Sequence, residues 1–359
     1  MIEPSEIIDK LQKKAENILK STDILKVIGV DSMVTNFFNQ DIKLDFVVQV
    51  ETKEGENYHI CFIIKSSGQP RFARGTAYQL QFISHNQNNI YGVFGAPYIS
   101  DEAKRICQEL GVGYLDLAGN CFFKFNNVFI SVEGKPNPYP TKRQQKSIFS
   151  PRSTRFLRVL LCNPKREWYV KEIAQEAKIS LGHASNLKKL LLNDEFIKEI
   201  KSNKVAKFCL TNPERLLKEW TDNYSFNKNK QKNYYSLEDV KTIEKKISKY
   251  CDSNEIRYAL TLTSGASLVA PFLRYKKAFA YIGNSIEKVA SNLAWKEVPS
   301  GSNITVLEPY DEGIFYGLQE INGIKVVSSI QLYLDLKGYK ERGEEAAQFL
   351  LENVLRKQW

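Results

Sequence analysis

Residues 168–192, WYVKEIAQEAKISLGHASNLKKLLL, have the clearest periodic pattern in the sequence. Their apolar residues recur at helical spacing on both sides of a break at residues 178–180. This predicts a short helix over 170–177 and a second helix over 181–192, with the small Ala174 allowing a close crossing. The predicted apolar seam consists of Ile173, Ala174, Ala177, Ile179, Leu187, Leu190 and Leu191. Two short helices around a tight turn form a helix-turn-helix.

The flanking stretches extend this pattern. Upstream, SPRSTRFLRVLLC at 150–162 predicts a helix with Ser150 or Ser153 as its cap. Downstream, FIKEIKSNKVAKFCL at 196–210 has two alternating runs around polar residues 202–204, which predicts a basic β-hairpin. A helix, a helix-turn-helix and a hairpin in this order predict a winged helix over residues 148–222.

The charge of the chain is concentrated in the same region. Of the formal net charge of +10, residues 1–139 carry 14 basic and 16 acidic residues, residues 140–232 carry 21 and 9, and residues 233–359 carry 16 and 16. The three sums are −2, +12 and 0. A basic segment between neutral neighbours is typical of a nucleic-acid-binding module, although a solvated basic surface is the alternative.

The apolar seam leaves polar side chains free on the second predicted helix, where they would reach base edges and phosphates in the major groove of duplex DNA. Basic residues of the first helix, Arg158 among them, and of the hairpin would add backbone contacts. The candidate DNA-binding residues are Arg152, Arg155, Ser180, Gly182, His183, Ser185, Asn186, Lys188, Lys189, Lys201, Lys204 and Lys207. A homodimer is a further expectation, because duplex sites are often two-fold symmetric.

Residues 1–135 alternate helical and strand patterns, which predicts an α/β domain. After an opening helix, IKLDFVVQVE at 42–51 and YHICFIIK at 58–65 are β-rich runs around a turn and predict a hairpin. The proline-rich and basic stretch at 136–147 predicts a linker.

The predicted hairpin carries the outline of a PD-(D/E)xK nuclease site. In that arrangement an Asp on one strand, and a Glu or Asp two residues before a Lys on the next, hold a divalent ion. Asp45 and Lys65 have suitable positions, but Ile63 occupies the place of the second carboxylate. One carboxylate holds a hard dication poorly against water, so we expect a degenerate site with no metal, unless Glu51 or Gln79 supplies the missing ligand.

Residues 233–359 again alternate strands and helices, which predicts a third, α/β or α+β domain. A strand followed by Ser264, Gly265 and a helix resembles the opening of the nucleotidyltransferase fold. The next predicted strand, KAFAYIG at 277–283, lacks the two carboxylates that this chemistry needs to hold magnesium. We therefore expect a nucleotidyltransferase-like fold with neither nucleotide transfer nor a cofactor.

Composition excludes several other classes. No run approaches the roughly 18 apolar residues of a membrane span, and the start of the chain is amphipathic and acidic, unlike a signal peptide. The six cysteines are scattered without a Cys-x-x-Cys pair, and only three histidines are present. We expect a cytoplasmic protein with reduced cysteines and no zinc site.

Four stretches resemble AbiEi-type antitoxins and transcriptional regulators of type IV toxin-antitoxin (abortive infection) systems, in their long form. They are KSSGQPR at 65–71, GVGYLDLAGN at 111–120, the helix-turn-helix, and VVSSIQLYLDLKGYKERGEEAAQFLLE at 326–352. The last is the most specific, through Gln331, Tyr333, Leu334, Asp335 and residues 343–346. The resemblance implies a restriction-endonuclease-like N-terminal domain, with Ile63 where relatives have Glu.

The resemblance also implies a bacterial DNA-binding regulator that represses its own operon and neutralises a nucleotidyltransferase-like toxin. The leading hypothesis is therefore a regulator without enzymatic activity. The alternative from another class is a metal-dependent PD-(D/E)xK-type nuclease that the winged helix targets to DNA. A third hypothesis is an interaction protein whose outer domains sequester a partner.

Overall fold

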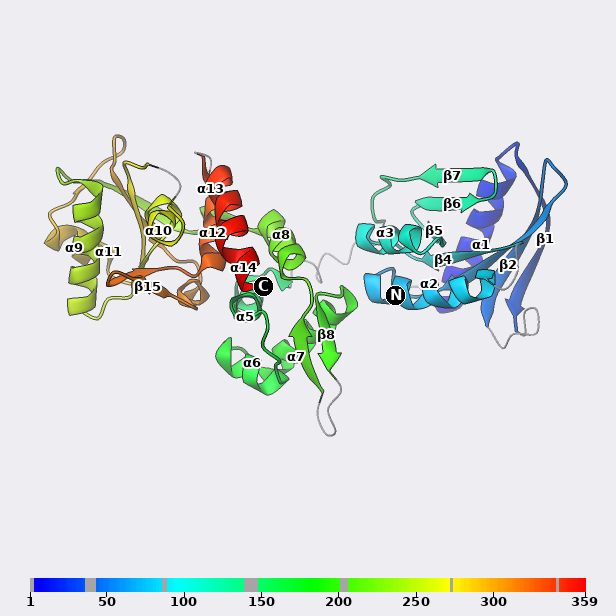
Figure 1. The fold of residues 1–359 in the computed structure, drawn as a ribbon, viewed down its shortest axis with the longest axis horizontal. Helices are drawn as coiled ribbons and strands as arrows, with labels where there is room; N and C mark the ends of the chain where they lie inside the picture. Colours follow the sequence, from blue (N-terminus) through cyan, green and yellow to red (C-terminus); the bar gives the residue numbers. More distant parts are fainter. Residues whose placement is uncertain are drawn as a thin grey trace. The chain divides into compact units, whose positions relative to one another are not determined.

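The computed structural model describes residues 3–35, 43–85, 89–138, 148–200, 206–271, 274–339 and 342–359. The chain forms two compact units (Figure 1). The N-terminal unit comprises Met1–Lys142 with Asn193–Glu195, and the C-terminal unit comprises Arg143–Leu192 with Phe196–Trp359.

The N-terminal unit is built on a seven-stranded sheet in the order β1-β2-β3-β4-β5-β6-β7. The predicted hairpin is confirmed, because β2 and β3 are antiparallel with Phe46 opposite Phe62. Strands β3, β4 and β5 are parallel to one another. The strands are β1 (Leu25–Val34), β2 (Leu44–Thr52), β3 (Asn57–Ile64), β4 (Ile90–Ala96), β5 (Gly113–Asp116), β6 (Cys121–Phe125) and β7 (Val128–Val132).

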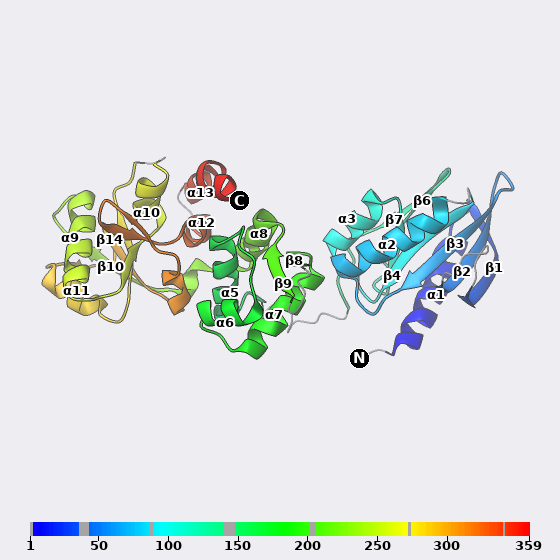
Figure 2. The same cartoon turned by 60° about the horizontal axis from the view of Figure 1, so that its bottom comes forward.

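Helices cover both faces of this sheet, as the alternation of patterns predicts (Figure 2). Helix α1 (Pro4–Lys20) buries Ile7, Leu11, Ala15 and Leu19 against one face. Helices α2 (Pro70–His85) and α3 (Asp101–Glu109) pack on the other face. Helix α3 begins after Ser100, whose hydroxyl accepts the N–H of Ala103 as its N-cap.

The C-terminal unit begins with the elements predicted for residues 148–222. Helices α5 (Pro151–Cys162), α6 (Val170–Glu176) and α7 (Leu181–Asn193) precede an antiparallel hairpin of β8 (Ile197–Ile200) and β9 (Lys207–Leu210). Helix α8 (Pro213–Asn223) follows, with Asn212 as its N-cap.

The rest of the C-terminal unit is a second seven-stranded sheet with helices, in the order β13-β10-β14-β12-β11-β16-β15. Its strands are β10 (Lys230–Tyr235), β11 (Tyr258–Leu260), β12 (Ala278–Ile282), β13 (Lys296–Glu297), β14 (Ile304–Glu308), β15 (Gln319–Ile321) and β16 (Ile324–Val326). Its helices are α9 (Val240–Ser253), α10 (Leu262–Val269), α11 (Ile286–Asn292), α12 (Ser329–Lys337), α13 (Gly343–Leu350) and, after a π-helical turn at Leu351–Leu355, α14 (Arg356–Gln358).

Ser264 and Gly265 do not start the helix that follows β11, contrary to what the resemblance to a nucleotidyltransferase opening implies. Helix α10 begins earlier, at Leu262, so both residues lie inside the helix and are buried. The Ser264 hydroxyl accepts the N–H of Phe279, and a Cβ on Gly265 would lie 3.0 Å from a methyl of Leu332. The pair serves close packing and is not open to a nucleotide.

One hydrophobic core joins the two parts of the C-terminal unit. It contains Phe156 of α5, Leu187 of α7 and Trp220 of α8 together with Leu334 of α12 and Leu350 of α13. The segments 148–222 and 233–359, predicted as separate domains, therefore share a packed interior.

In the described ranges, no helix is long and apolar enough to cross a membrane. Four of the six free cysteines are buried, and Cys162 and Cys209 are partly buried.

Candidate nucleic-acid interface

The helix-turn-helix is formed by the predicted seam. Ile173, Ala174, Ala177, Leu187, Leu190 and Leu191 are buried, and Ile179 packs against the same core. In the turn, Lys178 has a left-handed φ of 53°, and the N–H of Ile179 returns to the carbonyl of Ala174 at 3.0 Å. Ser180 starts α7, and its Oγ accepts the N–H of His183 at 3.3 Å.

One face of α7 carries polar residues that point to solvent. Gly182, Ser185, Asn186 and Lys189 are exposed and follow one another at helical spacing. A Cβ on Gly182 would meet nothing within 4 Å, so the backbone there is open to a close approach. Ser180 is exposed just before this face. The structure therefore brings five of the predicted residues together on one accessible surface, which we call the α7 face.

Two predicted residues of the same helix do not belong to the α7 face. Lys188 is only 14% exposed, because its ammonium group pairs with Glu199 at 2.8 Å and lies 5.5 Å from the centre of the Phe208 ring. His183 is half-buried, with Nε2 3.1 Å from the Oγ of Ser153. Lys188 connects α7 to the hairpin, and the His183 ring connects α7 to α5.

The three arginines of α5 differ in their exposure to solvent. Arg152 is exposed, as a phosphate contact requires. Arg155 donates three hydrogen bonds of 2.8–3.0 Å to the carboxylate of Asp311, so its guanidinium is already paired. Arg158 is fully buried. The expectation of backbone contacts from Arg155 and Arg158 is therefore wrong, because neither side chain is presented to solvent as a free cation.

Of the three lysines that the sequence predicts as DNA contacts of the hairpin, the structure describes only one. Lys201 and Lys204 lie outside the described residues. Lys207 is partly exposed and pairs with Glu167 at 3.3 Å. Sequence reasoning missed Lys198, which is exposed on β8, and Leu181, a large apolar residue that is 55% exposed at the start of α7. Leu181 could have been found, because it lies outside the seam that Leu187 and Leu191 define.

A buried polar network lies in the interior of the C-terminal unit. Arg158 of α5 donates to the Oε1 of Gln331 in α12 at 2.5 Å, and its guanidinium lies 4.9 Å from the centre of the Trp220 ring. Gln331 in turn donates to Asp335 at 2.8 Å. The sequence marks Gln331 and Asp335 only as family-typical residues, and the structure shows that they connect α12 to α5.

Asp335 is the centre of this network. Its carboxylate accepts hydrogen bonds from Thr261 at 2.6 Å, Tyr224 at 2.6 Å and Tyr281 at 3.1 Å, besides Gln331. Burial raises the pKa of Asp335 to about 6, although the four hydrogen bonds act in the opposite direction. Four donors to one buried carboxylate fix the position of α12 against β11, β12 and the segment after α8.

The nuclease-like pair lies in the N-terminal unit, at the end of the β2–β3 hairpin. Asp45 precedes Phe46 and Ile63 follows Phe62, so the two residues face each other across the hairpin. The Asp45 carboxylate accepts the N–H of Ile64 at 2.6 Å. Ile63 is 4% exposed and packs with Ala77 and Leu80 of α2. The place of a second metal ligand is thus part of an apolar core, and the described residues contain no cluster of three or more metal-binding side chains.

Residues 209–356 match the model of a family described as "Transcriptional regulator, AbiEi antitoxin, Type IV TA system". The match supports a regulator or antitoxin role, in agreement with the resemblance seen in the sequence. It begins within β9, so it covers α8 and the second sheet, whereas α6 and α7 lie outside it. No curated protein matches the chain.

Two solved structures of endonucleases are similar to part of the chain. "Structure of EndoMS in apo form" has 13% sequence identity and a TM-score of 0.21, over 30% of this chain and 45% of that chain. A repair endonuclease from Pyrococcus abyssi has 14% identity and a TM-score of 0.23, over 32% of this chain and 47% of that chain. The chain spans less than half of either protein, and TM-scores this low assign neither a fold nor an activity.

Proposed function

We propose that the chain is a DNA-binding transcriptional regulator of the antitoxin type, and that it binds duplex DNA through the α7 face. The observation that carries this proposal is the exposure of Gly182, Ser185, Asn186 and Lys189 on one side of a helix whose other side is buried. A helix held in this way by a helix-turn-helix fits the major groove. The charge of +12 over residues 140–232 supports a nucleic-acid partner.

The side chains of the α7 face have complementary roles. The Asn186 amide both donates and accepts, which suits the major-groove edge of adenine. Lys189 provides a charge for phosphate or guanine, and the open backbone at Gly182 allows the start of the helix to approach the duplex closely. The exposed Leu181 can contact a thymine methyl group.

A shift assay with duplex DNA from upstream of the gene tests this assignment. We expect Asn186→Ala combined with Lys189→Ala to weaken binding by more than about tenfold, since one base contact and one phosphate contact are lost. Lys188→Ala is the matched control, because the neighbouring Lys188 pairs with Glu199 and does not belong to the α7 face. Unchanged affinity of the double variant, or an equal loss in the control, would contradict the proposal.

The family match over residues 209–356 supports a second activity, the neutralisation of a toxin encoded beside this gene. The resemblance implies a nucleotidyltransferase-like toxin and repression of the shared operon. Co-expression of this chain with the neighbouring gene product tests both parts. We expect rescue of growth and a co-purified complex; growth arrest without any complex would remove the antitoxin role and leave the regulator.

We propose that the N-terminal unit is a nuclease-like domain without catalytic activity. Two observations support this proposal. The Asp45 carboxylate accepts a backbone N–H, and the residue opposite Asp45, Ile63, packs in the apolar core. The same observations disfavour a metal-dependent nuclease.

A further inference from the structure

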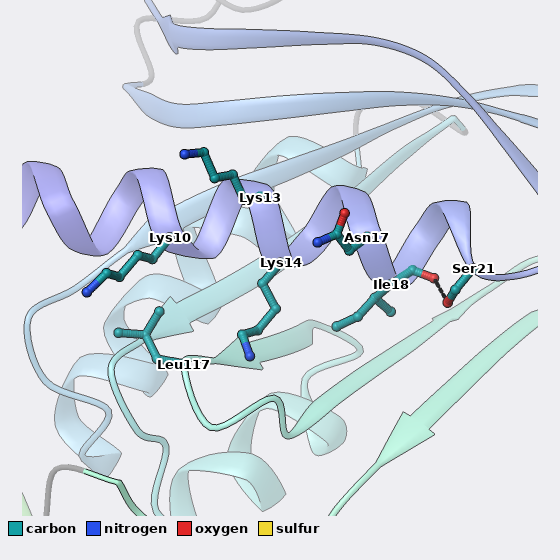
Figure 3. Close-up of a pocket in the computed structure, with 7 residues that line it drawn as sticks. All are labelled: Lys10, Lys13, Lys14, Asn17, Ile18, Ser21 and Leu117. Carbon is teal, nitrogen blue, oxygen red and sulfur yellow. Dashed lines mark hydrogen bonds between the residues drawn. The ribbon is translucent and has the colours of Figure 1, made fainter.

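A groove lined by lysines lies on the N-terminal unit, along α1 (Figure 3). It has a volume of 530 Å³ and is lined by Lys10, Lys13, Lys14, Asn17, Ile18 and Ser21 of α1 and the following turn, and by Leu117 beyond β5. Lys10 and Lys14 extend from α1 on the side where Leu117 lies, and Lys13 extends to the other side. The N-terminal unit has almost no net charge, so this is a local concentration of positive charge.

A further lysine from outside the helix, Lys135, lies close to Lys14 beside the groove. A Cβ atom on Gly119 would lie 2.9 Å from the Nζ of Lys135 and 3.4 Å from the Nζ of Lys14. The two ammonium groups are therefore no further apart than the sum of these distances, and both lie beside a glycine with a φ of +93°. Two cations held this close repel each other, and an anion between them would relieve the repulsion.

Buried polar contacts fix this arrangement. Asn120 is fully buried, its Nδ2 donates to the carbonyl of Lys135 at 3.1 Å, and its Oδ1 accepts the N–H of Lys135 at 2.9 Å. The same Nδ2 donates to Asp116 at 2.9 Å, and Asp116 also accepts the N–H of Gly119 at 2.9 Å. The 116–120 turn and the backbone of Lys135 thus form one rigid unit, from which the Lys135 side chain projects.

The charges at this turn are not neutralised by the protein. Among the described residues, Lys13, Lys14 and Lys135 take part in no ion pair, and Asp116 is fully buried with its oxygens turned to backbone and amide N–H groups. Lys10 pairs with Glu6 at 2.7 Å, but both side chains are about half exposed, and such pairs exchange readily.

We propose that Lys14 and Lys135, flanked by Lys10, bind the phosphate backbone of duplex DNA independently of the α7 face. Lysines bind phosphate as point charges, without the geometry that selects a particular anion. Seven residues line the groove in the described chain, and they include neither an aromatic ring for stacking nor a carboxylate to hold a sugar or a base. Lys10 and Lys14 are separated by about 6 Å along the helix axis. This separation lets the two side chains contact neighbouring phosphates of one strand.

The groove lies where parallel strands of the N-terminal sheet end. Leu117 follows β5 and donates its N–H to the carbonyl of Pro97, and Lys65 follows β3 and donates to that of Gly95. Because β3, β4 and β5 are parallel, both residues lie at the same edge of the sheet. Phosphate contacts at this site would add affinity that does not depend on base sequence.

Binding of a random-sequence 30-base-pair duplex to the full chain tests the proposal, with Asn186→Ala and Lys189→Ala present to remove the contribution of the α7 face. We expect Lys14→Gln combined with Lys135→Gln to lower the slope of log affinity against log salt by about 1.8, the value for two phosphate contacts. Lys53→Gln combined with Lys124→Gln is the control, since both lysines are exposed in the same unit outside the groove. An unchanged slope, or an equal change in the control, would overturn the proposal.

Acetylation of lysines followed by mass spectrometry gives a local readout on the same protein. Duplex DNA should protect Lys14 and Lys135 by more than about threefold and leave Lys53 and Lys124 reactive. Equal protection by tripolyphosphate at the same phosphate concentration would assign the groove to a small anion, and protection by single-stranded RNA alone would assign it to RNA; either result overturns the DNA assignment. Loss of affinity in the groove variants but not in the α7 variants would contradict the proposed function and leave this proposal standing.

Discussion

Arg158 in α5 and Gln331 in α12 share two hydrogen bonds inside the C-terminal unit, from Nη2 at 2.5 Å and from Nε at 3.2 Å to the same oxygen. The two residues are separated by 173 positions and are both fully buried. Through Gln331 the network continues to the carboxylate of Asp335. The helix that supports the α7 face is thus connected to the region that matches the antitoxin family.

Gln331→Leu should lower the free energy of unfolding of the C-terminal unit by about 3–5 kcal/mol, because it leaves the Arg158 guanidinium and the Asp335 carboxylate without their shared partner. Urea unfolding measures this loss. Gln348→Leu is the control, since Gln348 is exposed on α13, and it should change stability by less than about 0.5 kcal/mol. Equal effects of the two substitutions would show that the network adds nothing to stability.

Asp335 should make the C-terminal unit less stable as the pH rises. Its pKa is about 6 in the folded protein, raised from 3.8 by burial, so the folded state holds the proton more tightly than the unfolded state. The stabilisation is fully present below pH 3.8 and is lost as the pH rises through 6, by about 3 kcal/mol in total. Urea unfolding between pH 4 and 7.5 measures it.

Asp335→Asn should remove this pH dependence, because the amide keeps the shape of the carboxylate but does not titrate. The measured quantity is the difference in unfolding free energy between wild type and variant at each pH. The contributions of other titrating groups cancel in this difference. A difference that stays constant from pH 4 to 7.5 would show that Asp335 has the same pKa in both states.

The substitution Gly182→Glu should change DNA affinity without lowering the stability of the fold. Gly182 has open space around it and lies in the first turn of α7, where an acidic side chain is favourable to the helix dipole. We expect thermal stability to be unchanged or slightly higher. Affinity for operator DNA should fall by more than about tenfold, because a carboxylate would meet phosphates at close range. Retained affinity in anisotropy titrations would place the contact surface elsewhere.

Asp45 should matter for stability and not for catalysis. Asp45→Ala leaves the partly buried N–H of Ile64 without its acceptor and should lower the free energy of unfolding by about 1 kcal/mol, whereas Asp45→Asn keeps an oxygen in place and should cost less. With plasmid DNA and Mg²⁺ or Mn²⁺, we expect no cleavage by the wild type. Cleavage by the wild type that is lost in Asp45→Asn would establish a nuclease and refute a structural role.

The helical and strand periods of the sequence determined the local elements. The seam of Ile173, Leu187 and Leu191 sets the two helices of the turn, and the alternation in residues 42–51 and 58–65 sets the β2–β3 hairpin. Strand β1 was missed because most of its residues are half or fully exposed, so no apolar alternation marks them. The apolar seam also predicts correctly that Gly182, Ser185, Asn186 and Lys189 are exposed.

Only the tertiary structure decides which of the remaining polar residues are available to a ligand. Lys188 and Lys189 are identical neighbours in the sequence, yet Glu199 of the hairpin pairs with the first and leaves the second exposed. Arg158 has the helical spacing of a surface residue, and Gln331 and Trp220 from distant segments bury it. The ammonium groups of Lys14 and Lys135 lie close together at Gly119, and the buried Asn120 holds the backbone of Lys135.

The sequence by itself therefore determined the local elements and the basic middle segment, because these depend on residue type and on spacing within a few turns or strands. The tertiary structure decided the single core of the C-terminal unit, the pairing of its arginines and the groove on α1. These depend on contacts between residues 100 or more positions apart, and the spacing of residues along the chain carries no information about such contacts.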